Sequence, residues 1–439
     1  MLSPLQFLAI VATCIILAPV VALWIWSVAA PTSHWFCVGF PLRVVRTHLS
    51  WTKICDGCHL SIPYRIGPDG QPQNKYPRLG AMTAHRFGFN VWISLLPGQT
   101  PENFKSICPE LSHAWRVHSV QILDIKPGAV FVSVTATDPL TNVIAPPPET
   151  EVLRAAVGML ETGAPWVIDF RTIPHWLIVG ATQSGKSTLL NALIVALSQQ
   201  RVALVGIDLK QGVELGPYQP RLSRLATTRS EAVEVLAQLI VILTNRLTMC
   251  GLAGKHNIWE LPDEDRPAPI VCVIDEVAEL YLMTSSDEKD DIVAVTTSLL
   301  RIAQLGRAVG IHLLVAGQRF GSDIGTGVTA LRAQLGGRIC HRVNDPETSR
   351  MVLGDLAPDG VKAAQSISHH MRGVAVAVTD GGFWHRARSV YTSGEQAEQA
   401  ARDNAHLAPT WQALISLTDN PSAGTATEGD QDNTAGDAP

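Results

Sequence analysis

A glycine-rich octapeptide between an apolar run and a helical pattern restricts the fold of this chain more than any other feature. Residues Gly180–Ser187 read GATQSGKS and fit the pattern G-x-x-x-x-G-K-[ST]. The run His175–Val179 (HWLIV) predicts a strand before it, and the apolar spacing after it predicts a helix over Lys186–Ser198. Glycines in such a turn let backbone N–H groups point at phosphate oxygens, beside the positive end of the helix. A chance glycine-rich turn is the alternative, but the strand and helix context favours a nucleoside triphosphate site.

The motif assigns a task to each part of this phosphate loop, as we call Gly180–Ser187. Lys186 is expected to reach the β- and γ-phosphates of ATP, and the Ser187 hydroxyl is expected to bind Mg²⁺. The residues expected to contact the nucleotide are Gly180, Ala181, Thr182, Gln183, Ser184, Gly185, Lys186, Ser187 and Thr188.

Two carboxylates follow a second apolar run. Val271–Ile274 (VCVI) predicts a buried strand, and Asp275 and Glu276 come directly after it. A strand in this position delivers Asp275 to the Mg²⁺ shell from its carboxyl end. Glu276 can polarise an attacking water, which favours hydrolysis of ATP over binding alone. Exposed acids at the end of a strand are the alternative interpretation.

A third apolar run, Ile311–Ala316, is followed by Gly317, Gln318 and Arg319. The carboxyl ends of parallel strands share one edge of an open α/β sheet. The Gln318 amide is therefore a candidate to orient water or to sense the γ-phosphate. The alternative is an ordinary polar loop residue.

Between residues 151 and 391, apolar runs of strand length alternate with helical patterns. The further predicted elements are a strand over Val202–Ile207, a helix around Glu231–Leu247, a strand over Ile270–Ile274 and a helix around Ile292–Leu305. Continuous apolar strands separated by helices indicate a parallel sheet that is covered on both faces. The expected fold class is α/β, a P-loop NTPase (RecA-like) domain with a central parallel sheet, over residues 151–400.

The N-terminal segment predicts a membrane anchor. The run Leu5–Ala30 contains no charged residue, and as a helix it would be about 39 Å long, enough to span the hydrocarbon core with some tilt. A cleavable signal peptide is the alternative, disfavoured because no basic residue precedes this long run. Arg43, Arg46 and Lys53 follow it, so the positive-inside rule places the rest of the chain in the cytoplasm. We expect residues 1–42 to anchor the chain in the cell membrane with at least one pass.

A small domain and an acidic tail flank the predicted α/β domain. Residues 43–150 predict a mostly β or α+β membrane-proximal domain with a proline-rich linker, in which Val117–Val134 forms two strands around the Pro127-Gly128 turn. Residues 401–439 hold one base and six acids, equal to the net charge of −5 of the whole chain, and their composition predicts disorder. The remainder is neutral overall, which does not exclude a nucleic-acid partner, because binding needs a local basic surface.

A single C-x-x-C motif lies at Cys55–His59 (CDGCH). A structural zinc site needs four ligands, so Cys108 and His113 would have to be recruited. A redox dithiol is a further alternative, without a thioredoxin-like context. The interpretation that the ligand count favours is a tight turn with reduced thiols.

Four segments resemble the motor domain of the FtsK/SpoIIIE DNA translocases. They are Pro174–Thr188 (PHWLIVGATQSGKST), Gly206–Leu215 (GIDLKQGVEL), Ile270–Leu280 (IVCVIDEVAEL) and Arg301–Arg319 (RIAQLGRAVGIHLLVAGQR). The TQSGKST, DLK-x-GVEL and AGQRFGSD forms are more similar still to the Tra-type conjugative transfer proteins of actinobacterial plasmids and integrative elements. The resemblance implies a homo-hexameric ring that threads double-stranded DNA and hydrolyses ATP between its subunits.

Two arginines acquire roles from this resemblance. Arg307 occupies the place of the family's arginine finger, which acts on the nucleotide of the neighbouring subunit. Its alternative role is to cap helix carbonyls before Gly310. Arg332 lies in the segment similar to the pore loop, where a basic side chain can grip the DNA backbone without reading bases. A solubilising surface arginine is the alternative there.

The same resemblance ranks the functions. The segregation translocases carry a C-terminal winged-helix module and usually several membrane spans, whereas this chain has an acidic tail and one predicted span, which favours a conjugative transfer motor. A cell-division or chromosome-segregation translocase and a coupling ATPase of a protein secretion system are the alternatives within the fold. A nucleotide-binding scaffold without turnover is the non-enzymatic alternative, and Glu276 argues against it.

Overall fold

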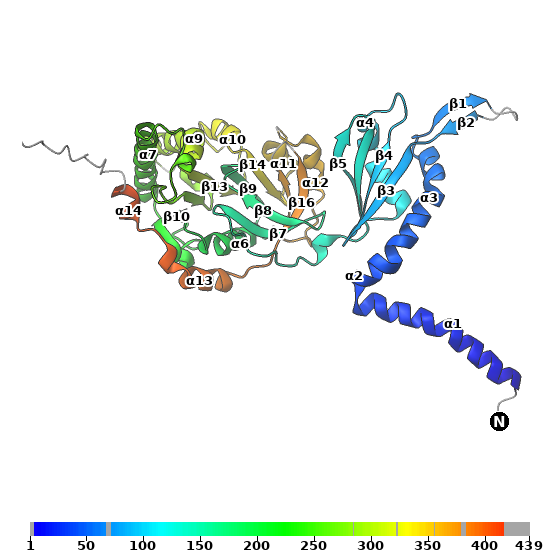
Figure 1. Cartoon of the computed structure of the whole chain (residues 1–439). Helices are drawn as coiled ribbons and strands as arrows, with labels where there is room; N and C mark the ends of the chain where they lie inside the picture. Colours follow the sequence, from blue (N-terminus) through cyan, green and yellow to red (C-terminus); the bar gives the residue numbers. More distant parts are fainter. Residues whose placement is uncertain are drawn as a thin grey trace, which may run out of the picture. The chain divides into compact units, whose positions relative to one another are not determined.

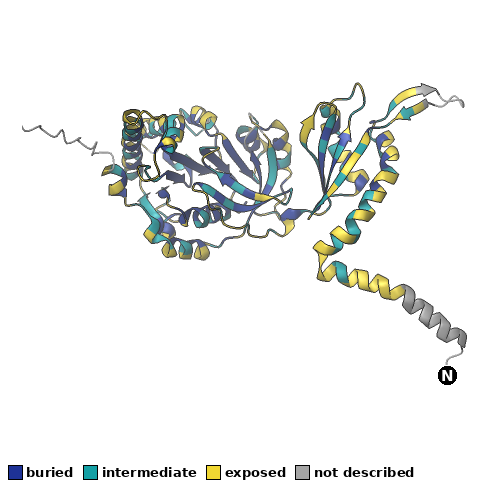
Figure 2. Ribbon diagram, viewed as in Figure 1, coloured by how far each residue is buried: buried dark blue, intermediate teal, exposed yellow. Residues whose placement is uncertain are grey.

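A computed structural model describes residues 4–66, 72–283, 285–321, 324–354, 356–378 and 383–416. The chain divides into two compact units (Figure 1). The first comprises Met1–Val143 with Met159–Ala164, and the second comprises Ile144–Gly158 with Pro165–Pro439. Each unit buries a core of its own (Figure 2).

The first unit begins with the helix α1 (Pro4–Ala29), which contains Pro19 and no charged residue. Its side chains are described from Leu17 onward, and the large apolar ones, among them Trp24 and Val28, are mostly exposed.

The rest of the first unit is an antiparallel sheet covered by helices. The sheet has the order β3-β4-β6-β5, with β3 (Arg78–His85), β4 (Gly88–Ser94), β5 (Ser119–Lys126) and β6 (Ala129–Thr135). The helices are α2 (Pro31–His34), α3 (Phe40–Gly57), α4 (Pro101–Ser106) and α5 (Cys108–Trp115), and β1 (Ile62–Ile66) pairs with β2 (Pro72–Lys75). The hairpin β5–β6 confirms the two strands predicted around the Pro127-Gly128 turn.

Aromatic side chains hold the helices of the first unit on its sheet. Trp51 of α3 stacks on Trp115 of α5 with ring centroids 5.8 Å apart. The Trp51 indole N–H donates a hydrogen bond of 2.6 Å to the Pro77 carbonyl, so its one polar atom is satisfied although the side chain is buried. Phe89 of β4 lies beside Trp115 in the same core.

The second unit is built on a ten-stranded sheet with the order β11-β10-β12-β13-β9-β14-β15-β16-β7-β8. Its first strands are β7 (Arg154–Leu160), β8 (Pro165–Asp169), β9 (His175–Val179), β10 (Ala203–Ile207) and β11 (Leu222–Ala226). The others are β12 (Ile270–Ile274), β13 (Ile311–Gly317), β14 (Gly337–His341), β15 (Val374–Val378) and β16 (Trp384–Ser389). All residues of β9, β10, β12 and β13 are buried, as expected for strands covered on both faces.

Only part of this sheet matches the predicted parallel arrangement. The six strands from β11 to β14 run parallel, whereas β14 with β15 and β15 with β16 are antiparallel. The sheet is therefore mixed. The short connection between β15 and β16 accounts for the antiparallel pairing of these two strands, since parallel neighbours need a long crossover.

Helices cover both faces of the sheet, α6 and α13 on one and α7, α9 and α10 on the other (Figure 1). Their bounds are α6 (Lys186–Ser198), α7 (Arg229–Leu252), α9 (Lys289–Val309), α10 (Val328–Gln334) and α13 (Gly394–Asp403). The shorter helices are α8 (Val277–Tyr281), α11 (Pro346–Leu353), α12 (Pro358–Gln365) and α14 (Trp411–Ser416). The predicted helix over Lys186–Ser198 is confirmed at both ends.

Two helices among the described side chains are long and apolar enough to cross a membrane, α7 and α9. They pack along each other in the second unit. Leu239 of α7 and Leu299 of α9 are fully buried there. Burial of one face beside a sheet explains their apolar composition without a membrane.

Ordered structure continues beyond the expected start of the tail at residue 401. The indole N–H of Trp411 in α14 donates a hydrogen bond of 2.6 Å to the Gln238 side chain of α7. Leu414 is buried in the same place. Two apolar residues thus fix a segment that composition alone assigned to the tail, and residues 417–439 lie outside the described range.

Candidate nucleotide-binding site

Three sequence segments predicted to act together meet at one edge of the sheet. The strands β12, β13 and β9 are neighbours and parallel, so their carboxyl ends lie side by side. The phosphate loop follows β9, Asp275 and Glu276 follow β12, and Gln318 follows β13. This edge is the usual ligand position in an open α/β sheet.

The phosphate loop has the backbone that its glycines predict. Gly185 has a φ of +114°, and a Cβ atom there would lie 2.5 Å from the backbone nitrogen of Gly373. A Cβ on Gly180 would overlap the Ser184 hydroxyl and the Cβ of His341. Gln183 also has a positive φ, of 61°, in a turn that closes through a hydrogen bond from the Ser184 N–H to the Ala181 carbonyl. Side chains at the two glycines would therefore destroy the loop.

Residues far along the chain support this loop from behind. The Gly373 N–H donates to the Ser184 carbonyl at 2.9 Å, and the Ala181 N–H donates to the Arg342 carbonyl at 2.9 Å. The Arg342 guanidinium donates to the Thr182 carbonyl at 3.1 Å. The loop is therefore held by the turn before β15 and by the end of β14.

His341 is fully buried next to the loop. Its Nδ1 donates to the Val374 carbonyl at 3.1 Å, because a carbonyl can only accept. Burial lowers the pKa of His341 to about 4, despite the hydrogen bond to Val374, and Lys186 lowers it further. The ring is neutral at physiological pH and adds no charge to the loop.

Lys186 and Asp275 contact each other directly. The Lys186 Nζ lies 2.8 Å from the Asp275 carbonyl oxygen and 3.1 Å from its Oδ1. Asp275 is only 1% exposed, so its charge is stabilised by this partner and not by water. Ser187 and Thr188 lie in the first turn of α6, whose N–H groups have no acceptors within the helix.

A second lysine, Lys210, completes the charge balance of the site. Its Nζ lies 3.3 Å from the Asp275 Oδ2 and 3.7 Å from the Glu276 Oε2. Burial lowers the pKa of Lys210, but Asp275 and Glu276 outweigh it, and the pKa lies above the ordinary value. The sequence predicted no role for Lys210, which belongs to the DLK-x-GVEL motif of the family resemblance. The usable signal was its position two residues after Asp208, at the end of the strand β10 next to β12.

Glu276 is mostly buried and has few partners. Burial raises its pKa above the ordinary value, although Lys186, the Gln318 N–H and Lys210 oppose this shift. Its Oε1 accepts a hydrogen bond of 3.2 Å from the Gln318 backbone N–H. Its Oε2 accepts no hydrogen bond from any residue that the structure describes. A carboxylate with a raised pKa and one oxygen that accepts no hydrogen bond suits the task of accepting a proton from water.

Gln318 is brought to the site, but through its backbone. Its N–H reaches Glu276, whereas its side chain is exposed. The reason is the position of β13 between the strands that carry the phosphate loop and Asp275. The predicted role of the amide side chain stays a prediction.

The residues present fit ATP with Mg²⁺. The phosphate loop provides a close backbone turn at the start of a helix, and the buried Ser184 hydroxyl has no hydrogen-bond partner among the described residues. Lys186 supplies the cation for phosphate oxygens, and Asp275 and Ser187 supply the hard oxygen ligands that Mg²⁺ prefers. Without a nucleotide or a metal ion, Lys186 and Lys210 neutralise the two carboxylates of the site.

Arg307 lies elsewhere in the unit, near the end of α9 and exposed. It is at the edge where β13 begins, so at least the length of β9, about 16 Å, separates it from the phosphate loop of its own chain. Arg332 is half-buried in α10, and its carbonyl accepts a hydrogen bond from Arg338. The structure brings neither arginine to the site of its own chain.

The C-x-x-C motif lies at the end of α3. Cys55 is fully buried and Cys58 is partly buried. Burial, with smaller contributions from Asp56 and Cys58, raises the pKa of Cys55 to about 12, which disfavours the thiolate that metals bind. Across the described residues there is no group of three or more His, Cys, Asp or Glu side chains placed to hold a metal.

Comparison with known sequences gives matches across both units. The FtsK/SpoIIIE family pattern matches residues 147–250 and 231–322, and the actinomycete conjugal transfer protein N-terminal domain matches residues 22–136. The transfer protein TraSA of Streptomyces ambofaciens is 36% identical over 393 residues, which cover 85% of this chain and 95% of that protein. A sporulation regulatory protein of Streptomyces azureus is 45% identical over 255 residues, 58% of this chain and 82% of that protein.

Among solved structures, the pCW3 conjugation coupling protein TcpA, in its monomer form with ATPgS, has a similar fold. The TM-score is 0.54 at 21% sequence identity, over 81% of this chain and 98% of that one. At this identity the likeness concerns the fold alone.

Proposed function

The chain belongs to the family of the transfer protein TraSA, with an ATPase domain of the FtsK/SpoIIIE type, and from this premise we propose that it is a membrane-anchored motor that moves double-stranded DNA in conjugation. The observation that carries this proposal is the match over nearly the whole length of a transfer protein, in both units. The grouping of the phosphate loop, Asp275 and Glu276 at one sheet edge supports the ATPase part.

ATP is proposed to bind with its phosphates in the phosphate loop. Lys186 would leave Asp275 for the β- and γ-phosphate oxygens, which is a short movement because its Nζ already lies in the site. Ser187 and Asp275 would hold Mg²⁺, which when bound neutralises charge on the phosphates. Lys210 then remains near the two acids as their counter-charge.

Glu276 is the proposed general base. Its Oε1 is held by the Gln318 N–H, which fixes the carboxylate, and its Oε2 is the oxygen that can accept a proton from the attacking water. The raised pKa makes it a stronger base than an exposed glutamate. Gln318 is thus proposed as a positioning residue, through its backbone.

Arg307 is proposed to act in a neighbouring subunit of a homo-hexameric ring. Because it lies at the sheet edge opposite the phosphate loop of its own chain, it can serve only a nucleotide that another chain presents. Its guanidinium would then stabilise charge on the transferring phosphoryl group. Arg332 is proposed to contact the DNA backbone from the pore side, on the resemblance of its segment alone.

The helix α1 is proposed as the membrane anchor, with the motor in the cytoplasm. Its length of 26 residues, its lack of charge and its exposed apolar side chains support this role. The basic residues Arg43 and Arg46 follow it on the proposed cytoplasmic side.

The test is ATP hydrolysis by the full-length chain in detergent, with long duplex DNA, with single-stranded DNA and without DNA. Strong stimulation by the duplex alone is expected, with Lys186→Ala as the inactive reference. Hydrolysis that no DNA stimulates would contradict the proposal and would favour a protein substrate. Transfer of the element from cells that carry Lys186→Ala at normal expression would also contradict it.

A further inference from the structure

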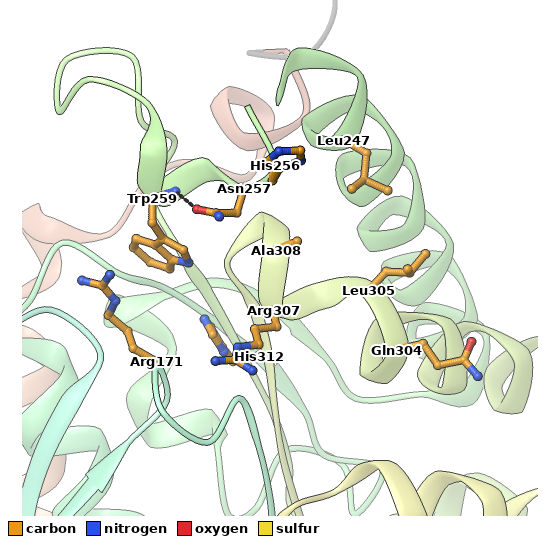
Figure 3. Close-up of a pocket in the computed structure, with 10 residues that line it drawn as sticks. All are labelled: Arg171, Leu247, His256, Asn257, Trp259, Gln304, Leu305, Arg307, Ala308 and His312. Carbon is orange, nitrogen blue, oxygen red and sulfur yellow. Dashed lines mark hydrogen bonds between the residues drawn. The ribbon is translucent and has the colours of Figure 1, made fainter. Parts of the chain in front are cut away.

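A cavity of about 610 Å³ opens at the sheet edge where β9 and β13 begin (Figure 3). It lies between the loop before β9, the end of α7, the segment before β12 and the end of α9. Arg307 lines it together with Arg171, Trp259 and His312. The phosphate loop of the same chain lies at the opposite edge of the sheet, so this cavity is separate from the site described above.

The charge of the cavity favours an anion. Arg171 and Arg307 both line it, and no carboxylate is found among the described residues of its lining. His312 adds no charge, because burial lowers its pKa to about 4 although the bond to the Pro174 carbonyl opposes this. Two guanidinium groups without an acidic partner are a typical arrangement for binding phosphate.

Arg171 is held in place by an aromatic platform. Its guanidinium lies over the Trp259 ring, 4.4 Å from the centroid, and Figure 3 shows the two side chains next to each other. The Arg171 backbone N–H donates to the Asp169 carboxylate at 2.8 Å, which fixes the backbone below the guanidinium. Stacking leaves the edge of a guanidinium, with its N–H donors, available to a ligand.

The platform itself is fixed. The Trp259 backbone N–H donates to the Asn257 side-chain oxygen at 3.0 Å. Arg266 lies near the same ring and donates to the carbonyl oxygens of Ile258, Trp259 and Leu261. A tryptophan so restrained positions Arg171 before any ligand arrives, which lowers the entropy lost on binding.

The inner wall of the cavity offers one unused polar atom. His312 donates from Nδ1 to the Pro174 carbonyl at 3.1 Å, so its Nε2 is an acceptor. This Nε2 is buried and has no partner among the described residues. It can accept a hydrogen bond from a water or a protonated oxygen that enters with the anion.

We propose that this cavity receives the phosphate end of the nucleotide bound to a neighbouring copy of the chain, and that Arg171 contacts it as a second arginine beside Arg307. This inference rests on the proposed ring. A nucleotide in the phosphate loop of the same chain cannot supply the anion, because that loop lies about 16 Å away along β9, so in the proposed ring the nucleotide belongs to another chain. An acidic peptide segment is the competing class of ligand, and the variants below distinguish it from the nucleotide.

The first experiment compares Arg171→Ala with Arg402→Ala in the full-length protein. Arg402 is an exposed arginine that pairs with Glu398 of its own helix, so it serves as a matched control. Arg171→Ala is expected to lower kcat by about 10- to 100-fold. Affinity for a fluorescent ATP analogue should not change, since the phosphate loop is intact. A kcat equal to that of the control overturns the inference.

The second experiment tests supply from the neighbouring chain directly. Arg171→Ala keeps an intact phosphate loop, and Lys186→Ala keeps an intact Arg171. In randomly mixed rings about one quarter of the interfaces combine both intact parts, so a mixture of two inactive proteins should regain up to about a quarter of the wild-type rate. A folding defect in the Arg171→Ala chain, or a role within its own chain, cannot be repaired in this way. A mixture that stays inactive overturns the inference.

One further variant keeps the test decisive. Arg171→Lys keeps the charge but lacks the planar fork, and it should recover only part of the lost kcat. If the ligand were an acidic peptide, ATP hydrolysis in the Arg171→Ala protein would be unchanged or higher, which also overturns the inference. A wild-type protein whose hydrolysis ignores duplex DNA contradicts the proposed function, whereas restoration in mixtures would still support the shared site.

Discussion

Lys210 and Asp275 form an ion pair of 3.3 Å between Nζ and Oδ2, although they follow different strands of the sheet, β10 and β12. Lys186 holds the other oxygen of the same carboxylate at 3.1 Å. One buried aspartate thus has two lysine partners, and Lys210 also reaches Glu276. The site is balanced in charge before any nucleotide or metal enters, which is what a buried pair of acids requires.

Lys186→Ala should reduce ATP hydrolysis at least about a hundredfold, because the phosphates lose their main cation and Asp275 loses a partner. The measurement is phosphate release by the full-length chain with duplex DNA. Lys362→Ala is the control, since Lys362 is exposed on α12. Equal loss in both variants would point to a general defect and count against the role of Lys186.

Lys210→Met should move the acidic limb of the pH–rate profile to higher pH. Lys210 lowers the pKa of Glu276, and without it that pKa rises further above the ordinary value. A base that stays protonated to higher pH is active only at higher pH. The check is kcat between pH 5 and 9, and a profile with an unmoved acidic limb would show that Lys210 does not act on Glu276.

Glu276→Gln should keep ATP binding and lose about 10²- to 10⁴-fold in kcat. It should also raise the thermal stability at neutral pH. The folded-state pKa of Glu276 is raised, so the folded chain binds this proton more tightly, and stability falls as pH rises from the ordinary pKa through the raised one.

The stability half of this prediction has its own check. Tm measured from pH 4 to 8 should show a gap between variant and wild type that opens above the ordinary pKa of a glutamate and closes below it. A variant less stable than the wild type at pH 7 would contradict the assigned cost of the buried charge.

Gly185→Ala should destabilise the protein by about 1–3 kcal/mol and abolish ATP binding, because the residue has a positive φ and its Cβ would meet Gly373. Gly394→Ala is the matched control, since a Cβ there meets nothing within 4 Å. Chemical denaturation and nucleotide titration give both values. Normal ATP binding by Gly185→Ala would refute the geometry assigned to the loop.

Removal of Pro4–Ala29 should release the chain from the membrane fraction, because α1 is the segment proposed to cross the bilayer. The measurement is carbonate extraction of membranes, followed by detection of the chain. A chain that lacks α1 and still resists extraction would show that another segment binds the membrane.

The strands and helices around the phosphate loop were predictable because each carries a periodic apolar signal next to a chemical motif. β9, β12 and α6 have the predicted bounds, and Asp275 and Glu276 follow β12 as expected. These signals come from residues that are adjacent in the chain, so they can be recognised without knowledge of the tertiary structure.

The residues that the sequence did not reveal depend on pairing between distant strands. Lys210 reaches Asp275 only because β10 lies beside β12, and Arg171 lines the same cavity as Arg307 only because β9 and β13 begin at one edge. The antiparallel pairing of β16 with β15 was missed because β16 (WHRARS) carries basic side chains where an apolar run would be expected. The helix α14 was missed because it lies in a polar stretch of sequence. Trp411 and Leu414 hold it in place through contacts with residues that are distant in the sequence.

The turn that supports the phosphate loop limits how this chain can be shortened. Every residue to which we assign a chemical step at the nucleotide of its own chain precedes residue 319, yet the Ser184 carbonyl is held by Gly373. The wall behind the loop also includes His341 and Arg342. A truncated protein that ended after β13 would retain all its reactive groups and lose the surface against which they are aligned, so the smallest working ATPase must extend through the antiparallel strands.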